Sequence, residues 1–217
     1  MNRGALIAVL IGGFATVGLI GAALNKTTPS NDPLEGRSAV TDSGEDTADA
    51  APPEPAVKPR SGLTEAPPFL DTAGELREID GWLNTDATSY EAFAGQVQIV
   101  QFWTYSCYNC KNTLPYLQDI YEKHRPDGLE IIGVHAPEFN FERDPANVEV
   151  AAAELGVTWP IALDTERLNF RQWQGGPNYW PRTYVVDQNG AIRFDEIGEG
   201  RYQELEDTVV WLLENGP

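Results

Sequence analysis

Two cysteines, Cys107 and Cys110, are the residues of this 217-residue chain whose type and spacing could do chemistry. They stand where an apolar run, Val97 to Trp103, gives way to a segment with helical spacing. A thiol at a helix N-terminus faces unpaired backbone N–H groups and the positive end of the helix dipole, which favour its thiolate form. Because the thiolate is the form that attacks disulfides, the placement predicts a redox-active dithiol.

Other uses of the pair fit less well. A structural zinc site needs four ligands, and beyond this pair the chain offers no cysteine and only His124 and His135. Covalent haem attachment needs a histidine directly after the second cysteine, where Lys111 stands. A purely structural disulfide across a two-residue gap closes a very small loop and stabilises little. We therefore expect neither a metal nor an organic cofactor.

The chain before the dithiol divides into two segments. Ala5 to Leu24 is an uncharged apolar run of 20 residues, about 30 Å long as a helix, which is enough to cross a bilayer. Residues 1–24 are predicted to be a transmembrane anchor; the small residues Gly21 to Ala23 leave a cleaved signal segment as the alternative. Residues 25–60 are acidic, rich in proline and free of aromatic residues, and predict a disordered linker.

Residues 61–217 are predicted to form the catalytic domain. They carry 26 acidic and 10 basic side chains, a net charge of −16 out of −18 for the whole chain. Such a field repels nucleic acid and anionic membrane surfaces, so neither is an expected ligand. A dithiol domain behind an N-terminal anchor also fits a compartment where disulfides persist, so we expect it to lie outside the cytosol, in the periplasm or at the cell exterior.

Strands and helices alternate along this domain. The apolar patterns predict strands at 97–103, 129–134, 160–163, 183–186 and 191–196, and helices after the cysteines and at 144–155, 168–173 and 202–215. Asn189-Gly190 predicts a hairpin between the last two strands. Alternating strands and helices pair in parallel, and the hairpin adds antiparallel strands. We therefore predict an α/β domain with a mixed central sheet and helices on both faces.

Three stretches resemble one known superfamily. They are Phe102-Trp103-Thr104-Tyr105-Ser106-Cys107-Tyr108-Asn109-Cys110 with the following Leu114-Pro115-Tyr116-Leu117, Gly133-Val134-His135-Ala136-Pro137-Glu138-Phe139, and Trp180-Pro181-Arg182-Thr183-Tyr184-Val185-Val186-Asp187. Together with the opening Pro67-Pro68-Phe69 they resemble the thioredoxin superfamily, and within it the membrane-anchored TlpA/ResA-type thiol–disulfide oxidoreductases. The resemblance covers nearly all of the domain and implies a thioredoxin-like fold.

The resemblance also implies roles for individual residues. Cys107 would be the exposed nucleophile and Cys110 the buried resolving thiol. Pro181 matches the cis-proline of the family, which would leave the backbone of Trp180 free to pair with a substrate chain; an ordinary loop-to-strand junction is the alternative. Tyr108 and Asn109 lie between the cysteines, where residues tune the redox potential and meet the substrate.

One departure from the family concerns proton transfer. Thioredoxin carries a buried aspartate in the strand below its dithiol, and the matching residue here is Gln101, which cannot take a proton. Glu138 and His135 follow the 129–134 strand and are predicted to share a loop at the active edge of the sheet. Either could shuttle the proton of the resolving thiol. The alternative is that Glu138 is one of many surface acids and His135 packs against the sheet.

The leading hypothesis is therefore dithiol exchange that reduces protein disulfides. The resemblance implies a role such as cytochrome c maturation, with electrons supplied by a membrane carrier of the DsbD/CcdA kind. The main rival is a copper-binding assembly factor that uses Cys107, Cys110 and His135 as ligands, since thiolates and imidazole suit copper. A peroxidase on a related fold has less support, because the usual earlier and later cysteines are missing from this sequence.

Overall fold

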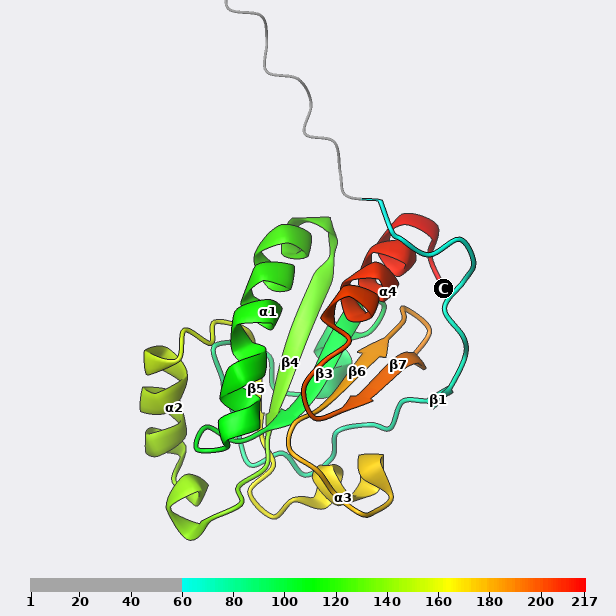
Figure 1. The fold of residues 1–217 in the computed structure, drawn as a ribbon. Helices are drawn as coiled ribbons and strands as arrows, with labels where there is room; N and C mark the ends of the chain where they lie inside the picture. The colour runs from blue at the N-terminus through cyan, green and yellow to red at the C-terminus, as the bar shows by residue number, and fades with distance from the viewer. Residues whose placement is uncertain (1–59) are drawn as a thin grey trace, which may run out of the picture. The chain divides into compact units, whose positions relative to one another are not determined.

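The computed structural model describes residues 60–217 (Figure 1). The predicted anchor and nearly all of the predicted linker lie outside these residues, so the segment boundaries at 24 and 60 stay predictions. Within residues 60–217, no helix combines the length and the apolar character that a membrane crossing requires.

The described residues form a mixed seven-stranded sheet in the order β1-β7-β6-β3-β4-β5-β2. The central strands β3, β4 and β5 run parallel, and β6, β7, β1 and β2 each pair antiparallel with their neighbours. The strands are β1 (Asp71–Thr72), β2 (Trp82–Leu83), β3 (Val97–Trp103), β4 (Leu129–His135), β5 (Ile161–Leu163), β6 (Arg182–Val186) and β7 (Ala191–Ile197).

The helices lie between these strands along the chain, except α4, which follows the last strand. They are η1 (Tyr90–Phe93), α1 (Tyr108–His124), η2 (Arg125–Asp127), η3 (Asn140–Arg143), α2 (Pro145–Glu154), α3 (Leu168–Gln174) and α4 (Tyr202–Asn215), where η marks a 3-10 helix. In Figure 1, α1 and α4 lie side by side on one face of the sheet, and these two helices contact each other. The predicted order of strands and helices is confirmed.

Strand β3 shows how the sheet separates two cores. All seven of its residues are buried. Ile99 and Trp103 pack with residues of α1, α2 and α4, whereas Val100 and Phe102 pack with Phe170 of α3 on the opposite face. Because successive side chains of a strand point to opposite faces, one strand contributes to both cores. Helices on both faces of a mixed sheet are confirmed.

Local signals explain where several elements begin and turn. The side chain of Asp144 accepts a hydrogen bond from the N–H of Ala146 and caps α2, whose first residue is Pro145. The carboxylate of Asp187 accepts from the N–H groups of Asn189 and Ala191, which closes the turn between β6 and β7. The predicted hairpin is therefore confirmed.

Gly133 in β4 is a position where only glycine fits. A Cβ atom built there would lie 2.8 Å from Nε1 of Trp103 and 3.1 Å from Nε1 of Trp159, both on buried side chains. Two indoles that are packed into a core cannot move aside at low cost.

We expect Gly133→Ala to lower the free energy of unfolding by about 1–3 kcal/mol, the usual cost of overpacking a core. Chemical denaturation monitored by tryptophan fluorescence measures it. Gly81→Ala is the matched control, because its Cβ would meet only Leu163 at an ordinary 3.5 Å. Equal unfolding midpoints for the two variants would show that the indoles make room.

Candidate active site

Cys107 occupies the N-cap position of α1. Its sulfur accepts a hydrogen bond from the backbone N–H of Cys110, with a Sγ–N distance of 3.4 Å. Strand β3 ends four residues earlier at Trp103, so the buried strand delivers the cysteine to the carboxyl edge of the sheet. The helix N-terminus predicted for the first thiol is thus present.

The surroundings of Cys107 favour its thiolate. The main cause is a hydrogen bond with the thiol of Cys110, and the backbone N–H groups of Cys110 and Asn109 add to it. These outweigh partial burial and the negative charge of Glu138, and they lower the pKa of Cys107 from 9.0 to about 7. A substantial fraction of this sulfur is therefore ionised at neutral pH.

Cys110 lies in the opposite environment. Its side chain is fully buried, in the core between α1 and the sheet. Burial raises the pKa of Cys110 far above its ordinary value, and its hydrogen bond to Cys107 and the charges of Cys107 and Glu142 raise it further. Both cysteines are free thiols in the structure. The pair therefore combines one accessible, acidic thiol with one buried thiol that keeps its proton.

The segment around Pro181 lies beside the nucleophile. The Trp180–Pro181 peptide bond is cis, as the resemblance implied, and the carbonyl oxygen of Trp180 is 3.9 Å from Sγ of Cys107. The indole of Trp180 is held in place because its N–H donates to the carbonyl of Ala136 and its ring stacks on Phe170. The carbonyl of Trp180 is therefore held in a fixed position beside Sγ of Cys107, where it can contact a molecule that binds at this sulfur.

The two residues between the cysteines are both exposed. Tyr108 has 73% of its surface accessible, and Asn109 lies next to it on the first turn of α1. Beneath them, the Gln101 side chain is buried and donates to the hydroxyl groups of Thr113 and Thr183. Gln101 therefore ties β3 to α1 and β6 through a neutral amide, where thioredoxin has an aspartate.

His135 does not share the loop that the sequence predicted. It is the last residue of β4, because the strand extends one residue beyond the predicted end. Its buried ring stacks on Tyr105 and its Nε2 lies 3.2 Å from Oγ1 of Thr104. Burial lowers the pKa of His135 from 6.5 to about 4, so the ring is neutral at pH 7. In the described part of the chain it forms no hydrogen bond to either sulfur, which supports the packing alternative.

Glu138 and Glu142 follow β4 and differ in their surroundings. Glu138 is exposed, and its charge opposes ionisation of Cys107. Glu142 is fully buried and its carboxylate is hydrogen-bonded to Ser106, one residue before the nucleophile. Glu142 was not predicted from the sequence, because within Asn-Phe-Glu-Arg it is indistinguishable from a surface acid.

The copper ligand set considered from the sequence is not assembled. Among residues 60–217, no group of three or more His, Cys, Asp or Glu side chains is arranged to hold a metal ion. His135 points its Nε2 at Thr104, and the two cysteines interact with each other and with the start of α1.

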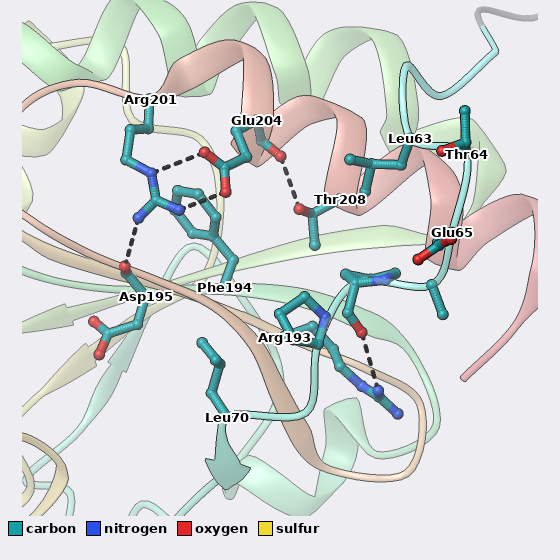
Figure 2. A pocket seen from close by; sticks show the side chains of 13 residues that line it. Leu63, Thr64, Glu65, Leu70, Arg193, Phe194, Asp195, Arg201, Glu204 and Thr208 are labelled. Carbon is teal, nitrogen blue, oxygen red and sulfur yellow. Dashed lines mark hydrogen bonds and ion pairs between the residues drawn. The ribbon is translucent and has the colours of Figure 1, made fainter.

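A separate hollow of about 560 Å³ lies between the entering segment, residues 63–70, and residues of β7 and α4 (Figure 2). Its two arginines are already engaged. Arg201 binds Glu204 and the carbonyl of Asp195, while Arg193 binds the carbonyl of Pro67 and the side chain of Asp187. The hydrogen bond from Arg193 of β7 to the carbonyl of Pro67 ties the entering segment to the sheet, and neither cysteine lines the hollow.

Fold and site together define a thioredoxin-like α/β domain with a Cys-x-x-Cys dithiol at the start of a helix. Residues 71–195, more than half of the chain, match the model of the AhpC/TSA family. The chain therefore belongs to the AhpC/TSA family.

Relatives with this domain include proteins of very different length. Protein DipZ of Mycobacterium tuberculosis is 41% identical over 146 residues, which are 65% of this chain and 21% of that protein. Thiol-disulfide oxidoreductase YkuV of Bacillus subtilis is 29% identical over 139 residues, which are 64% of this chain and 92% of YkuV. The chain thus spans about a fifth of the length of DipZ and nearly all of YkuV.

Solved structures show the same fold. A thioredoxin-like protein in its oxidised form matches with a TM-score of 0.58 and 27% identity, covering 68% of this chain and 97% of the other. A thiol-disulfide isomerase from Corynebacterium glutamicum matches with a TM-score of 0.55 and 22% identity, covering 69% of this chain and 97% of the other.

The unequal acidities of the thiols predict selective alkylation. Iodoacetamide should react with Cys107 with a half-maximal rate near pH 7, because its pKa is lowered to about 7. Cys110 should stay unmodified while the protein is folded, because it is buried. Mass spectrometry after timed quenching measures both. A midpoint near pH 9 for Cys107, or equal labelling of both cysteines, would contradict the described geometry.

Proposed function

We propose that this protein is an extracytoplasmic thiol–disulfide oxidoreductase that reduces protein disulfides through Cys107 and Cys110. The observation that carries the proposal is the asymmetry of the pair. Cys107 is accessible and its pKa is lowered to about 7, whereas Cys110 is buried and keeps its proton. A pair of this kind can attack first with one sulfur and resolve with the other.

The reaction proceeds in two exchanges. The Cys107 thiolate attacks one sulfur of a substrate disulfide, forms a mixed disulfide and releases the other substrate sulfur as a thiolate, which takes up a proton. Cys110 then gives up its proton and attacks Sγ of Cys107, which forms the Cys107–Cys110 disulfide and releases the second substrate thiol. The dithiol loses two electrons and two protons, and the substrate gains both.

Substrate contacts are assigned to the surface around the nucleophile. The carbonyl of Trp180 lies 3.9 Å from Sγ of Cys107, where it can accept a hydrogen bond from the backbone of an extended substrate chain. Tyr108 and Asn109 are exposed beside it. With Pro181, these residues form the proposed binding edge. Glu138 is the proposed proton carrier, because it is exposed and its charge acts on Cys107.

The direction of electron flow and the partner are further parts of the proposal. Similarity to the TlpA/ResA type supports a reductant that serves a pathway such as cytochrome c maturation, recharged by a membrane carrier of the DsbD/CcdA kind. The apolar run Ala5 to Leu24 supports an anchor that keeps the domain near such a carrier. YkuV, which is named a thiol-disulfide oxidoreductase, supports the reaction class.

Insulin reduction tests the reaction. With dithiothreitol as the final reductant, the full chain should accelerate insulin precipitation, and Cys107→Ser should abolish that acceleration because no nucleophile remains. Cys110→Ser, reduced beforehand and mixed with insulin after the dithiothreitol is removed, should instead accumulate a mixed disulfide with insulin, visible on non-reducing gels. Both variants change one sulfur to oxygen, so each controls for the other. If Cys107→Ser retained the unmutated rate, the proposed reaction would be wrong.

Labelling in intact cells tests the location. A membrane-impermeant maleimide should modify Cys107 without lysis, and the modified chain should stay in the membrane fraction after a carbonate wash. Cys107→Ser is the control for the site of labelling. Labelling that appears only after lysis would place the domain in the cytosol, and release by carbonate would exclude an uncleaved anchor.

A further inference from the structure

Glu142 is a buried carboxylate that the proposed exchange does not use. Its side chain is fully buried, although an isolated buried charge is costly unless it is paired or well hydrogen-bonded. Within residues 60–217, the groups that donate hydrogen bonds to its carboxylate are all uncharged. The neighbouring cation, Arg143, forms its ion pair with Glu166 instead.

The two oxygens of Glu142 bind two different loops. Oε1 accepts from the hydroxyl of Ser106 at 2.5 Å and from its backbone N–H at 3.3 Å. Oε2 accepts from the backbone N–H of Glu138 at 2.6 Å and from that of Phe139 at 2.8 Å. One carboxylate therefore joins the residue before Cys107 to the loop that follows β4.

The carboxylate is ionised at neutral pH. Burial alone would raise the pKa of Glu142, but hydrogen bonds from Ser106, Thr104, Phe139 and Glu138 outweigh it and hold the pKa below its ordinary value. The titratable groups that feel this charge are Cys110, His135 and Tyr105. The charge of Glu142 is therefore close enough to the dithiol to raise the pKa of Cys110. The nearby ring of His135 is neutral at pH 7, so it is not a cation that Glu142 could pair with.

We propose that Glu142 is a positioning residue: its carboxylate clamps Ser106 to the loop after β4 and so holds Cys107 at the N-cap of α1. The inference rests on the proposed function, for which that placement of the nucleophile is essential. The clamp acts on the backbone directly before the cysteine, and the N-cap position supplies the hydrogen bonds that favour the thiolate.

A change to glutamine should break this clamp at one end. The hydrogen bonds that Ser106, Glu138 and Phe139 make to Glu142 all come from donors, and a glutamine side chain has a single acceptor oxygen. If that oxygen keeps the N–H groups of Glu138 and Phe139, the amide NH₂ faces Ser106. The hydroxyl of Ser106 can rotate to accept from it, but the N–H of Ser106 loses its acceptor.

The experiment compares Glu142→Gln with Glu138→Gln in the full chain, and the readout is the pH midpoint of Cys107 alkylation. Loosening the clamp in Glu142→Gln should raise the midpoint by about half a pH unit, which roughly halves the thiolate at pH 7. Glu138→Gln removes a charge that opposes ionisation, so it should lower the midpoint. A purely structural role for Glu142 would shift the unfolding midpoint and leave the alkylation midpoint unchanged.

Ser106→Ala provides a second route to the same answer, because it removes the hydroxyl at the other end of the clamp and leaves Glu142 in place. It should raise the midpoint less than Glu142→Gln, and the double variant should add little to Glu142→Gln alone. If Glu142→Gln folds and its alkylation midpoint is unchanged or lowered, the proposed clamp is wrong. If Glu142→Gln does not fold, an unchanged or lowered alkylation midpoint in Ser106→Ala would overturn the proposal instead. Alkylation needs no disulfide substrate, so this result is independent of the insulin assay.

Discussion

The site depends on the backbone N–H groups that the first turn of α1 leaves without helical partners. Cys107 occupies the N-cap, and its sulfur accepts from the N–H of Cys110. The surrounding fold makes this contact possible. Strand β3 is buried on both faces and ends just before the cysteine, so the sulfur sits at the edge of the sheet rather than inside it. A central strand, a short loop and a helix start are therefore one functional unit.

Burial decides how the two thiols differ. They are three positions apart and interact with the same helix turn, yet the pKa of Cys107 is lowered and that of Cys110 is raised. Cys107 faces solvent on one side, so hydrogen bonds to its charged form dominate. Cys110 points into the core among apolar side chains, so desolvation of the charged form dominates. The position of each sulfur relative to the sheet, and not its chemistry, makes one reactive and the other protected.

Two acidic residues near the dithiol, Glu138 and Glu142, lie in different surroundings. Glu138 stays in solvent, where its charge is screened, and Glu142 is enclosed by neutral donors that take the place of water. A carboxylate held by N–H and O–H groups fixes the loops that supply them without adding a cation to the site. The structure thus places an exposed charge and a buried, hydrogen-bonded one only four residues apart.

The sequence by itself determined the elements whose causes are local. The apolar run of β3, the Asn189-Gly190 hairpin and the helix start at Cys107 could all be predicted, because periodicity and turn chemistry act over a few residues. Tertiary structure alone decided that His135 packs into the core and that Glu142 is buried against Ser106. Those outcomes depend on residues 31 and 36 positions away, brought together by the pairing of β3 with β4. The local sequence pattern does not indicate such contacts, because the same residues would also suit an exposed loop.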